Sequence, residues 1–503
     1  MKLREDRFNE TLISRVRPPD WVNPMPARRY NLVVIGAGTA GLVASAIAAS
    51  LGARVALIEK RLMGGDCLNF GCVPSKALIR VSKAYNEISR CSRFGIEIQG
   101  PLKLNSGSVM EWVRSVRSRI SENDSVHKFT KLGVDVFIGE ACFTGPSRVS
   151  VGDSELNFSK AAICTGTHPV ILEIPGLKHD DCLTNETVFE LNSIPDRLAV
   201  IGAGPVGCEL AQAFARLGSK VTLFHKHSRI LEREDEDASA ILHAKFMEDG
   251  IEIKLNTVFS EVSSLAHPKT ITFTQDSVVG KIEVDEILAS AGRSPNIRGL
   301  ELEKAGVDFD SRRGILVNDY LQTSNPNIFA AGDVCMNHKF THAADAAARL
   351  VVENSLFRKS SKVSELVIPW CVYTDPEIAH VGLYERTALA KGLKVRTFGL
   401  EMREVDRAIT DGAHDGFVKM IVEEKSDKIL GATVVGPNAG ELIAGITLAM
   451  KNRLGMKSIS STIYPYPTQS LAIKRTADKY MGSKLTQRLK WALGKWFWLK
   501  RII

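Results

Sequence analysis

The sequence predicts an α/β fold, chiefly because one pattern of apolar and glycine residues occurs twice along the chain. Residues 31–35 form a short apolar strand that runs into a glycine-rich loop at 36–41, and a helix and a second strand at 54–58 follow. The same order of strand, loop, helix and strand returns at residues 197–224. A single copy is weak evidence, but two complete copies indicate two Rossmann-like nucleotide-binding domains.

Length and composition limit the possible classes of protein. The 503 residues provide for about three to four domains. Nine scattered cysteines argue against a secreted disulfide framework, and residues 1–29 have no apolar stretch typical of a signal peptide, so a cytoplasmic location is expected. The net charge of +8 lies largely at the two chain ends and predicts no nucleic-acid partner. The acidic run at 232–237 is predicted to be a solvated helix start.

The first glycine-rich loop is expected to bind a dinucleotide. Glycines permit a tight turn and close approach of the backbone to a pyrophosphate, and the following helix N-terminus supplies N–H donors. Glu59 ends the second strand, where a carboxylate can accept hydrogen bonds from an adenosine ribose. The expected loop contacts are Gly36, Gly38 and Gly41.

The second glycine-rich loop differs from the first at the ribose position. His225 occupies the place that Glu59 has in the first copy, and Lys226, His227 and Arg229 follow it closely. A carboxylate would repel a 2′-phosphate and cations would attract it, so NADPH is expected in preference to NADH. A solvated basic loop is the alternative. The expected glycine contacts are Gly202, Gly204 and Gly207.

Two cysteines, Cys67 and Cys72, follow the first nucleotide-binding pattern, and no other pair in the chain has such a tight spacing. A second Cys/His pair does not follow nearby, so we expect no metal site at these thiols. A dithiol beside a nucleotide cofactor suits the transfer of an electron pair from a flavin to sulfur.

These motifs resemble those of the flavin-linked pyridine nucleotide–disulfide oxidoreductases, which include dihydrolipoyl dehydrogenase, glutathione reductase and mercuric reductase. Besides the two glycine loops, the resemblance rests on the cysteine segment 67–76 and on the stretches 291–296, 327–334 and 374–382. It covers about residues 30–480 of the chain.

The resemblance implies an α/β fold with two Rossmann-like domains and a C-terminal α+β dimerisation domain. Members of the family are homodimers whose active sites are shared between the two chains, so a homodimer is expected here. The implied segments are an N-terminal extension (1–29), an FAD-binding domain in two parts (30–172 and 293–366), an NAD(P)-binding domain (173–292), the dimerisation domain (367–482) and a basic amphipathic tail (483–503).

The resemblance also implies roles for individual residues. Cys72 would lie against the flavin of FAD, and Cys67 would face the substrate as the attacking thiolate. Lys76 would reach the flavin and pair with Glu209. The remaining implied cofactor contacts are Thr165, Gly166, Gly292, Gly332 and Asp333.

The chain departs from the usual disulfide reductases near its C-terminus. Tyr466 stands where they carry a proton-shuttling histidine, and Leu471 stands where a glutamate orients that histidine. A phenol is a poor base at neutral pH, which disfavours lipoamide or glutathione disulfide as the substrate. Mercuric reductases also have this tyrosine, and a soft metal ion binds thiolates directly. However, a metal-binding N-terminal domain and a C-terminal vicinal cysteine pair are missing, since the last cysteine is Cys371.

We therefore expect an enzyme that passes electrons from NADPH to Hg(II), another metal ion or a small oxidant. Two alternatives stay open: a disulfide reductase of the dihydrolipoyl dehydrogenase type, and a membrane-associated redox-sensing flavoprotein. The second alternative comes from residues 484–503, which hold six basic residues, no acidic residue and three tryptophans. Such a helix can lie on the anionic inner face of a membrane, or it can pack on the protein itself.

Overall fold

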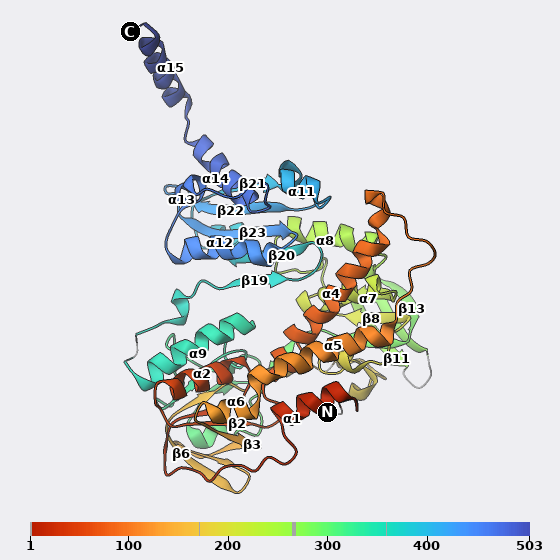
Figure 1. Cartoon of the computed structure of the whole chain (residues 1–503), viewed down its shortest axis with the longest axis vertical. Coiled ribbons are helices and arrows are strands. Elements are labelled where there is room, and N and C mark those ends of the chain that lie inside the picture. Colours follow the sequence, from red (N-terminus) through yellow and green to blue (C-terminus); the bar gives the residue numbers. More distant parts are fainter. Residues whose placement is uncertain (1–2, 171, 264–267, 359, 503) are drawn as a thin grey trace. The chain divides into compact units, whose positions relative to one another are not determined.

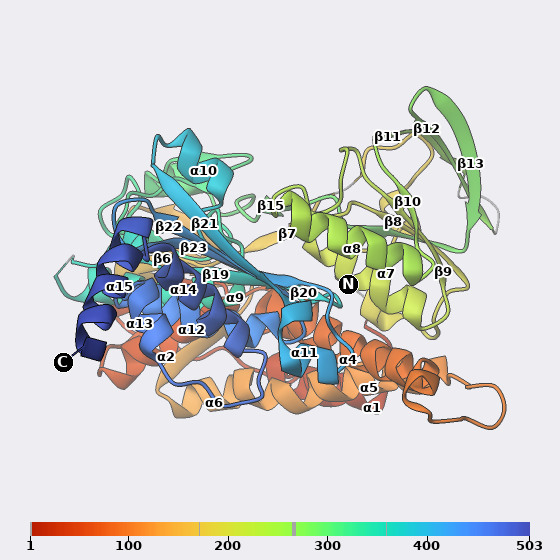
Figure 2. The same ribbon diagram turned by 90° about the horizontal axis from the view of Figure 1, so that it is seen from above.

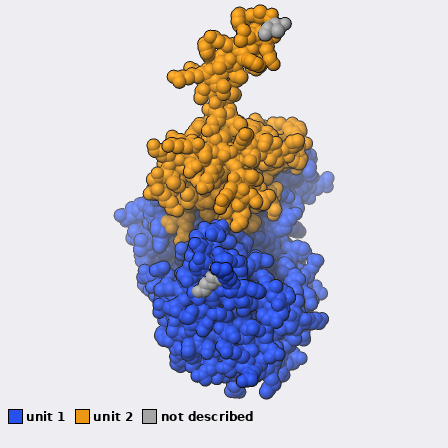
Figure 3. Space-filling view, turned by 90° about the vertical axis from the view of Figure 1, so that its left-hand side faces the viewer, with its two compact units in different colours: residues 1–231, 246–366 blue, residues 232–245, 367–503 orange. Residues whose placement is uncertain are grey.

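The computed structural model describes residues 3–170, 172–263, 268–358 and 360–502. The chain forms two compact units, which are coloured separately in Figure 3. Unit 1 comprises residues 1–231 and 246–366, and unit 2 comprises residues 232–245 and 367–503.

A seven-stranded sheet organises the first part of unit 1 (Figure 1). Its strand order is β3-β2-β1-β6-β5-β4, and β18 pairs in parallel with β6. The strands are β1 (Tyr30–Ile35), β2 (Val55–Glu59), β3 (Val134–Ile138), β4 (Ala141–Gly145), β5 (Arg148–Val151), β6 (Ser154–Ile163) and β18 (Ile328–Ala330). All residues of β2 and all but one of β1 are buried, as expected for parallel strands covered on both faces.

A second parallel sheet, in the order β10-β9-β8-β14, lies in the inserted segment of unit 1 (Figure 2). A three-stranded antiparallel sheet follows β10 in sequence, and Phe224 of β9 packs against Phe273 within their shared core. The strands of the two sheets are β8 (Arg197–Ile201), β9 (Lys220–Phe224), β10 (Glu252–Lys254), β11 (Thr257–Ser263), β12 (Lys269–Gln275), β13 (Val278–Val284) and β14 (Glu286–Ala289).

Helices connect these strands and lie beside the sheets, and two short strand pairs complete unit 1. Helix α2 packs against α9, and α4 packs against α5 and α7. The helices are α1 (Arg7–Val16), α2 (Thr39–Ser50), α3 (Gly65–Asn69), α4 (Cys72–Ser89), α5 (Ser106–Ile120), α6 (Val126–Lys131), α7 (Pro205–Arg216) and α9 (Thr341–Leu356). The short strands are β7 (Thr167–Pro169) with β15 (Arg293–Pro295), and β16 (Phe309–Asp310) with β17 (Gly314–Ile315).

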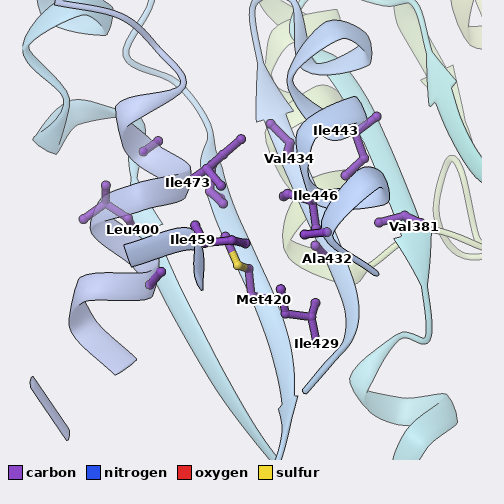
Figure 4. Packing of buried hydrophobic residues seen from close by; sticks show 14 of the residues in the cluster. Val381, Leu400, Met420, Ile429, Ala432, Val434, Ile443, Ile446, Ile459 and Ile473 are labelled. Carbon is purple, nitrogen blue, oxygen red and sulfur yellow. The ribbon is translucent and has the colours of Figure 1, made fainter. Parts of the chain in front are cut away.

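Unit 2 is built on a five-stranded antiparallel sheet in the order β19-β20-β23-β22-β21. Met420 and Val434 of the sheet pack with Ile446 and Ile473 of the helices in one apolar core (Figure 4). The strands are β19 (Pro369–Val372), β20 (Glu377–Gly382), β21 (Val395–Glu401), β22 (Phe417–Glu423) and β23 (Ile429–Gly436). The helices are α10 (Glu385–Ala390), α11 (Asp406–Thr410), α12 (Ala439–Lys451), α13 (Met456–Ser461), α14 (Leu471–Ser483) and α15 (Gln487–Ile502), while α8 (Glu236–Glu248) begins in unit 2 and ends in unit 1.

The predicted α/β fold class is confirmed, and both strand–loop–helix–strand patterns are present. The prediction of a solvated acidic run at 232–237 is wrong for its two central residues. Glu234 is buried, because it accepts hydrogen bonds from the Tyr384 hydroxyl at 2.5 Å and from Trp370 Nε1 at 2.9 Å. Asp235 is also buried and pairs with Lys419 at 2.7 Å.

The tail forms helix α15, but its apolar side chains do not keep to one face. Residues 496–499 are four consecutive apolar residues, and at 3.6 residues per turn they surround the helix. The expected amphipathic pattern therefore fails in the last two turns. No residue of α15 is buried.

Candidate active site

The first glycine-rich loop has a shape that only glycine permits at its tightest points. Gly36 has φ +101°, and a Cβ there would lie 2.5 Å from the carbonyl oxygen of Cys164. A Cβ on Gly41 would lie 1.8 Å from the Gly36 carbonyl oxygen. Gly38 caps helix α2, so the helix N-terminus opens directly on the loop. This open backbone cradle fits a dinucleotide pyrophosphate.

Glu59 is bonded to the loop backbone itself. Its carboxylate accepts hydrogen bonds from the Ala37 N–H and the Arg61 N–H, both at 2.7 Å. Burial raises the pKa of this carboxyl. Glu59 therefore fixes the shape of the loop, in addition to the expected role toward a ribose.

Three loops meet at the carboxyl edge of the seven-stranded sheet, because they follow β1, β6 and β18, which run in parallel. Thr165 and Gly166 follow β6, and the Thr165 hydroxyl donates to the Asn296 carbonyl at 2.7 Å. Gly332 and Asp333 follow β18, and Asp333 accepts a hydrogen bond from the Thr167 hydroxyl at 3.2 Å. Burial raises the pKa of Asp333. A half-buried carboxyl beside a glycine-rich loop fits the polar groups of FAD.

Cys67 and Cys72 lie on two successive helices, and both are free thiols in this structure. Cys67 is on α3, and Cys72 is the first residue of α4, where the helix N-terminus favours a thiolate. A hydrogen bond from the Cys67 thiol lowers the pKa of Cys72 to about 6, with help from the Thr341 hydroxyl, 3.2 Å away, and from Lys76. The same hydrogen bond raises the pKa of Cys67. In the dithiol form the negative charge is therefore favoured on Cys72. The role of Cys67 as the thiolate that attacks the substrate stays a prediction.

Lys76 and Glu209, which the resemblance pairs, form an ion pair with a distance of 2.7 Å between Nζ and Oε2. Lys76 is on α4, one turn after Cys72, and Glu209 is on α7. The Glu209 side chain is only 6% exposed, and the ion pair with Lys76 compensates for the removal of its carboxylate from water.

The second glycine-rich loop repeats the geometry of the first. Gly202 has φ +112°, and a Cβ on Gly207 would lie 1.8 Å from the Gly202 carbonyl oxygen. His225 Nδ1 accepts a hydrogen bond from the Ala203 N–H at 3.2 Å, as Glu59 does from Ala37. The two glycine-rich patterns in the sequence place His225 at the position of Glu59. They do not predict that both side chains accept a hydrogen bond from the loop backbone.

The remaining residues predicted for the nicotinamide cofactor follow strands β9 and β14. Lys226 is exposed, and His227 and Arg229 are half-buried, directly after β9. Gly292, with φ +126°, lies shortly after β14. A glycine-rich loop with open backbone fits a dinucleotide, and the preference for NADPH over NADH stays a prediction.

Tyr466 lies in unit 2, where its side chain is 72% exposed and its hydroxyl donates to Asp406 at 3.0 Å. That hydrogen bond raises the pKa of Tyr466, so the phenol stays protonated at neutral pH. Leu471 is the first residue of α14 and cannot titrate. Asp406 was missed by the sequence reasoning, because nothing in the pattern links two residues sixty positions apart. Cys67 and Cys72 lie in unit 1.

The hydrogen bond between the two thiols leads to a prediction about Cys72. In the reduced protein, alkylation of Cys72 by iodoacetamide should rise with pH around a midpoint of about 6, because the thiolate is the reacting form. Cys67→Ala removes the donor and should raise this midpoint by about one pH unit. Cys67→Ser keeps a donor and serves as the control. The rate is measured by mass spectrometry of the tryptic peptide 62–76. If the unaltered protein shows a midpoint near that of an ordinary cysteine, the lowered pKa assigned to Cys72 is wrong.

Comparisons with known proteins agree with this geometry. The model of the pyridine nucleotide-disulphide oxidoreductase family matches residues 30–348, and the model of its dimerisation domain matches residues 368–477. Mercuric reductase of Lysinibacillus sphaericus is 33% identical over 449 residues, which are 89% of this chain and 82% of that protein. Dihydrolipoyl dehydrogenase of Geobacillus stearothermophilus is 32% identical over 459 residues, which are 90% and 96% of the two chains.

Solved structures show the same fold. The HOCl-induced flavoprotein disulfide reductase RclA from Escherichia coli has a TM-score of 0.80 and 26% identity, covering 89% of this chain and 99% of its own. LpdA from Mycobacterium tuberculosis has a TM-score of 0.82 and 27% identity, covering 90% and 100%. The chain thus belongs to the pyridine nucleotide–disulphide oxidoreductases, FAD-dependent enzymes that use a pyridine nucleotide, and it carries their dimerisation domain.

Proposed function

We propose that the enzyme passes electrons from NADPH, through FAD and the Cys67–Cys72 disulfide, to Hg(II) or to another metal ion or small oxidant. The observation that carries this proposal is Tyr466, a phenol that replaces the proton carrier of disulfide reductases and whose hydroxyl donates to Asp406. Relatives named mercuric reductase, at 33% identity, support the same class of acceptor.

FAD, when bound, supplies the two-electron chemistry that links the nicotinamide to sulfur. The residues proposed to hold it are those at the carboxyl edge of the seven-stranded sheet: Gly36, Gly38, Gly41, Glu59, Thr165, Gly166, Gly332 and Asp333. Lys76 and Glu209 are proposed to orient it, because their ion pair lies one helical turn beyond Cys72.

The thiolate of the dithiol is proposed to bind the acceptor directly. Cys72 is ionised at neutral pH, since its pKa is about 6. A soft cation binds thiolate sulfur directly and displaces the remaining thiol proton, so this acceptor needs no separate base. A disulfide acceptor needs a proton delivered to its departing sulfur, and Tyr466 with a raised pKa is a poor partner for a cycle of proton uptake and release.

The proposed enzyme is a homodimer in which the second copy supplies Tyr466 to each dithiol. This arrangement is consistent with the dimerisation-domain match over residues 368–477. A dihydrolipoyl dehydrogenase-like activity is the second candidate, and it is supported by relatives of that name at 32% and 33% identity.

NADPH is proposed as the electron donor. His225 takes over the loop-fixing hydrogen bond of Glu59 without bringing a carboxylate, so the loop keeps its shape with no negative charge on the side chain at position 225. Lys226 and Arg229 then offer charge-assisted hydrogen bonds to a 2′-phosphate.

Helix α15 is proposed to contact an anionic membrane surface. Its exposed apolar side chains include Trp491, Trp496, Phe497 and Trp498, each more than half exposed, and no acidic residue opposes its cations. Lys495 lies 3.9 Å from the centre of the Trp491 ring, so positive charge lies beside exposed aromatic surface. Among the described residues, no helix is both long and apolar enough to cross a bilayer.

The acceptor is tested by measuring NADPH oxidation with Hg(II), glutathione disulfide and lipoamide under identical conditions. Hg(II) should give the highest kcat/KM, and Tyr466→Phe should slow acceptor reduction without slowing the reduction of the bound cofactor by NADPH. Turnover of lipoamide or dihydrolipoamide at about 10² per second would contradict the proposal and favour the second candidate.

The donor is tested by replacing Lys226 and Arg229 together with alanine. The ratio of kcat/KM for NADPH to that for NADH should fall by about 2–4 kcal/mol in free energy, because two charge-assisted hydrogen bonds are lost. Lys220→Ala, an exposed lysine at the opposite end of the same strand β9, is the matched control. Equal use of both nucleotides by the unaltered enzyme would contradict the preference.

The membrane contact is tested by deleting residues 484–503 and measuring co-sedimentation with vesicles of anionic or neutral phospholipid. The full chain should bind the anionic vesicles, most strongly at low salt, because each basic residue contributes about 1 kcal/mol. The deletion should remove this binding and leave NADPH oxidation unchanged. If the full chain stays free of anionic vesicles at low salt, the helix serves another contact.

A further inference from the structure

An N-terminal helix precedes the residues that match the family model. It packs within unit 1, the unit that contains Cys67 and Cys72. Helix α1 (Arg7–Val16) comes before the matched residues 30–348 and lies beside α5 (Figures 1 and 2). Leu12 and Val16 of this helix are buried, with exposed fractions of 1% and 0%. Asp6 caps the helix and also pairs with the buried Arg114 of α5 at 2.5 Å.

A buried guanidinium connects this helix to the redox segment. Arg117 of α5 is 1% exposed, and its Nη2 donates to Asn9 Oδ1 and to Glu190 Oε1, both at 2.6 Å. Its Nη1 donates to the carbonyl oxygen of Asn69 at 3.0 Å. Asn9 in turn donates to Glu190 Oε2 at 2.9 Å, which closes the network. The position of Arg117 is therefore fixed by a residue of the N-terminal helix.

The carbonyl that Arg117 holds lies between the two cysteines. Asn69 is the last residue of α3, two positions after Cys67 and three before Cys72. Its side chain is fully buried and donates to the carbonyl oxygens of Met63 at 3.0 Å and Gly65 at 2.8 Å. A restraint on Asn69 is thus a restraint on the whole turn that carries Cys67.

The N-terminal segment also holds the beginning of the same turn. Arg17 Nη1 donates to the carbonyl oxygens of Lys60 at 2.6 Å and Arg61 at 2.7 Å. The Met63 N–H donates to the Val16 carbonyl at 3.2 Å. Residues 60–69 are therefore bonded to the N-terminal segment directly at one end and through Arg117 at the other.

We propose that residues 4–17 form a clamp that positions the Cys67 turn relative to Cys72, with Asn9, Arg17 and Arg117 as positioning residues. The proposal rests on the redox role of the two cysteines given above. A disulfide closes only when its sulfurs meet at about 2 Å in a narrow range of angles. Loosening the turn lowers the effective concentration of one thiol at the other, and so disfavours the disulfide.

The test is the equilibrium of the purified full chain with dithiothreitol. As the Cys67–Cys72 disulfide is reduced to two thiols, dithiothreitol is oxidised to its cyclic disulfide, and two electrons and two protons are transferred. The tryptic peptide 62–76 contains both cysteines and no other, so mass spectrometry after thiol blocking gives the oxidised fraction. This readout needs neither NADPH nor an acceptor.

Asn9→Ala and Arg17→Ala should each shift this equilibrium toward the dithiol by about 2- to 10-fold, which corresponds to one net hydrogen bond. Asn23→Ala is the matched control, because Asn23 also belongs to the N-terminal extension but bonds to the backbone of Ile138 in the edge strand β3, at 3.2 and 2.8 Å. It should lower thermal stability without moving the equilibrium. Arg17 is half-buried on the surface, so its variant is expected to fold.

An equilibrium constant within twofold of the unaltered chain in both the Asn9 and Arg17 variants would overturn the clamp and leave the proposed function intact. The same shift in the Asn23 control would also overturn it, because the effect would then reflect general loosening. If the unaltered chain forms no disulfide in peptide 62–76, the proposed function fails, and the clamp proposal fails with it.

Discussion

The pairing of β18 with β6 is the constraint on which the geometry of the candidate active site in unit 1 depends. The chain leaves this sheet at Ile163 and returns to it at Ile328, and the register places Ile328 opposite Ala161. Because β18 is parallel to its neighbour, Gly332 and Asp333 emerge at the same sheet edge as the glycine-rich loop. Helix α9 begins at Thr341, and its first side chain reaches the sulfur of Cys72. The short strand β18 therefore positions Gly332 and Asp333 at the expected nucleotide-binding edge of the sheet. It also leads to helix α9, whose Thr341 contacts Cys72.

The two glycine-rich loops show how one backbone shape can be kept by different chemistry. In the first, a buried carboxylate accepts the Ala37 N–H, and in the second an imidazole nitrogen accepts the Ala203 N–H. A carboxylate and a neutral imidazole are equivalent acceptors for one N–H donor but differ by a full charge. The side chain after the second strand of each pattern can therefore be charged or neutral, while the glycine-rich turn expected to bind the pyrophosphate keeps its shape.

The sequence predicted most of what is encoded locally. Strand, loop and helix succeed each other within thirty residues in each nucleotide-binding copy, so apolar periodicity and glycine spacing were enough to find them. The Lys76–Glu209 contact was expected only from the family resemblance, and the ion pair is present. What the sequence could not predict depends on distant partners: Asn9 with Arg117, Asp406 with Tyr466, and Glu234 with Tyr384. Of these residues, Asn9, Arg117, Glu234 and Tyr384 are buried. A polar residue that will be buried has no local signature, because its partner alone makes the burial tolerable.

The buried position of Glu234 and Asp235 has a consequence for the autonomy of the dimerisation domain. These residues belong to a short segment, 232–245, that is inserted from the middle of the chain into unit 2. A polypeptide spanning only 367–503 would lack the carboxylates that Tyr384, Trp370 and Lys419 contact. The family's dimerisation module is contiguous as a sequence match, yet in this protein it is a composite folding unit. The segment 232–245 is translated more than a hundred residues before the rest of unit 2, so it is already synthesised when the strands of the domain emerge.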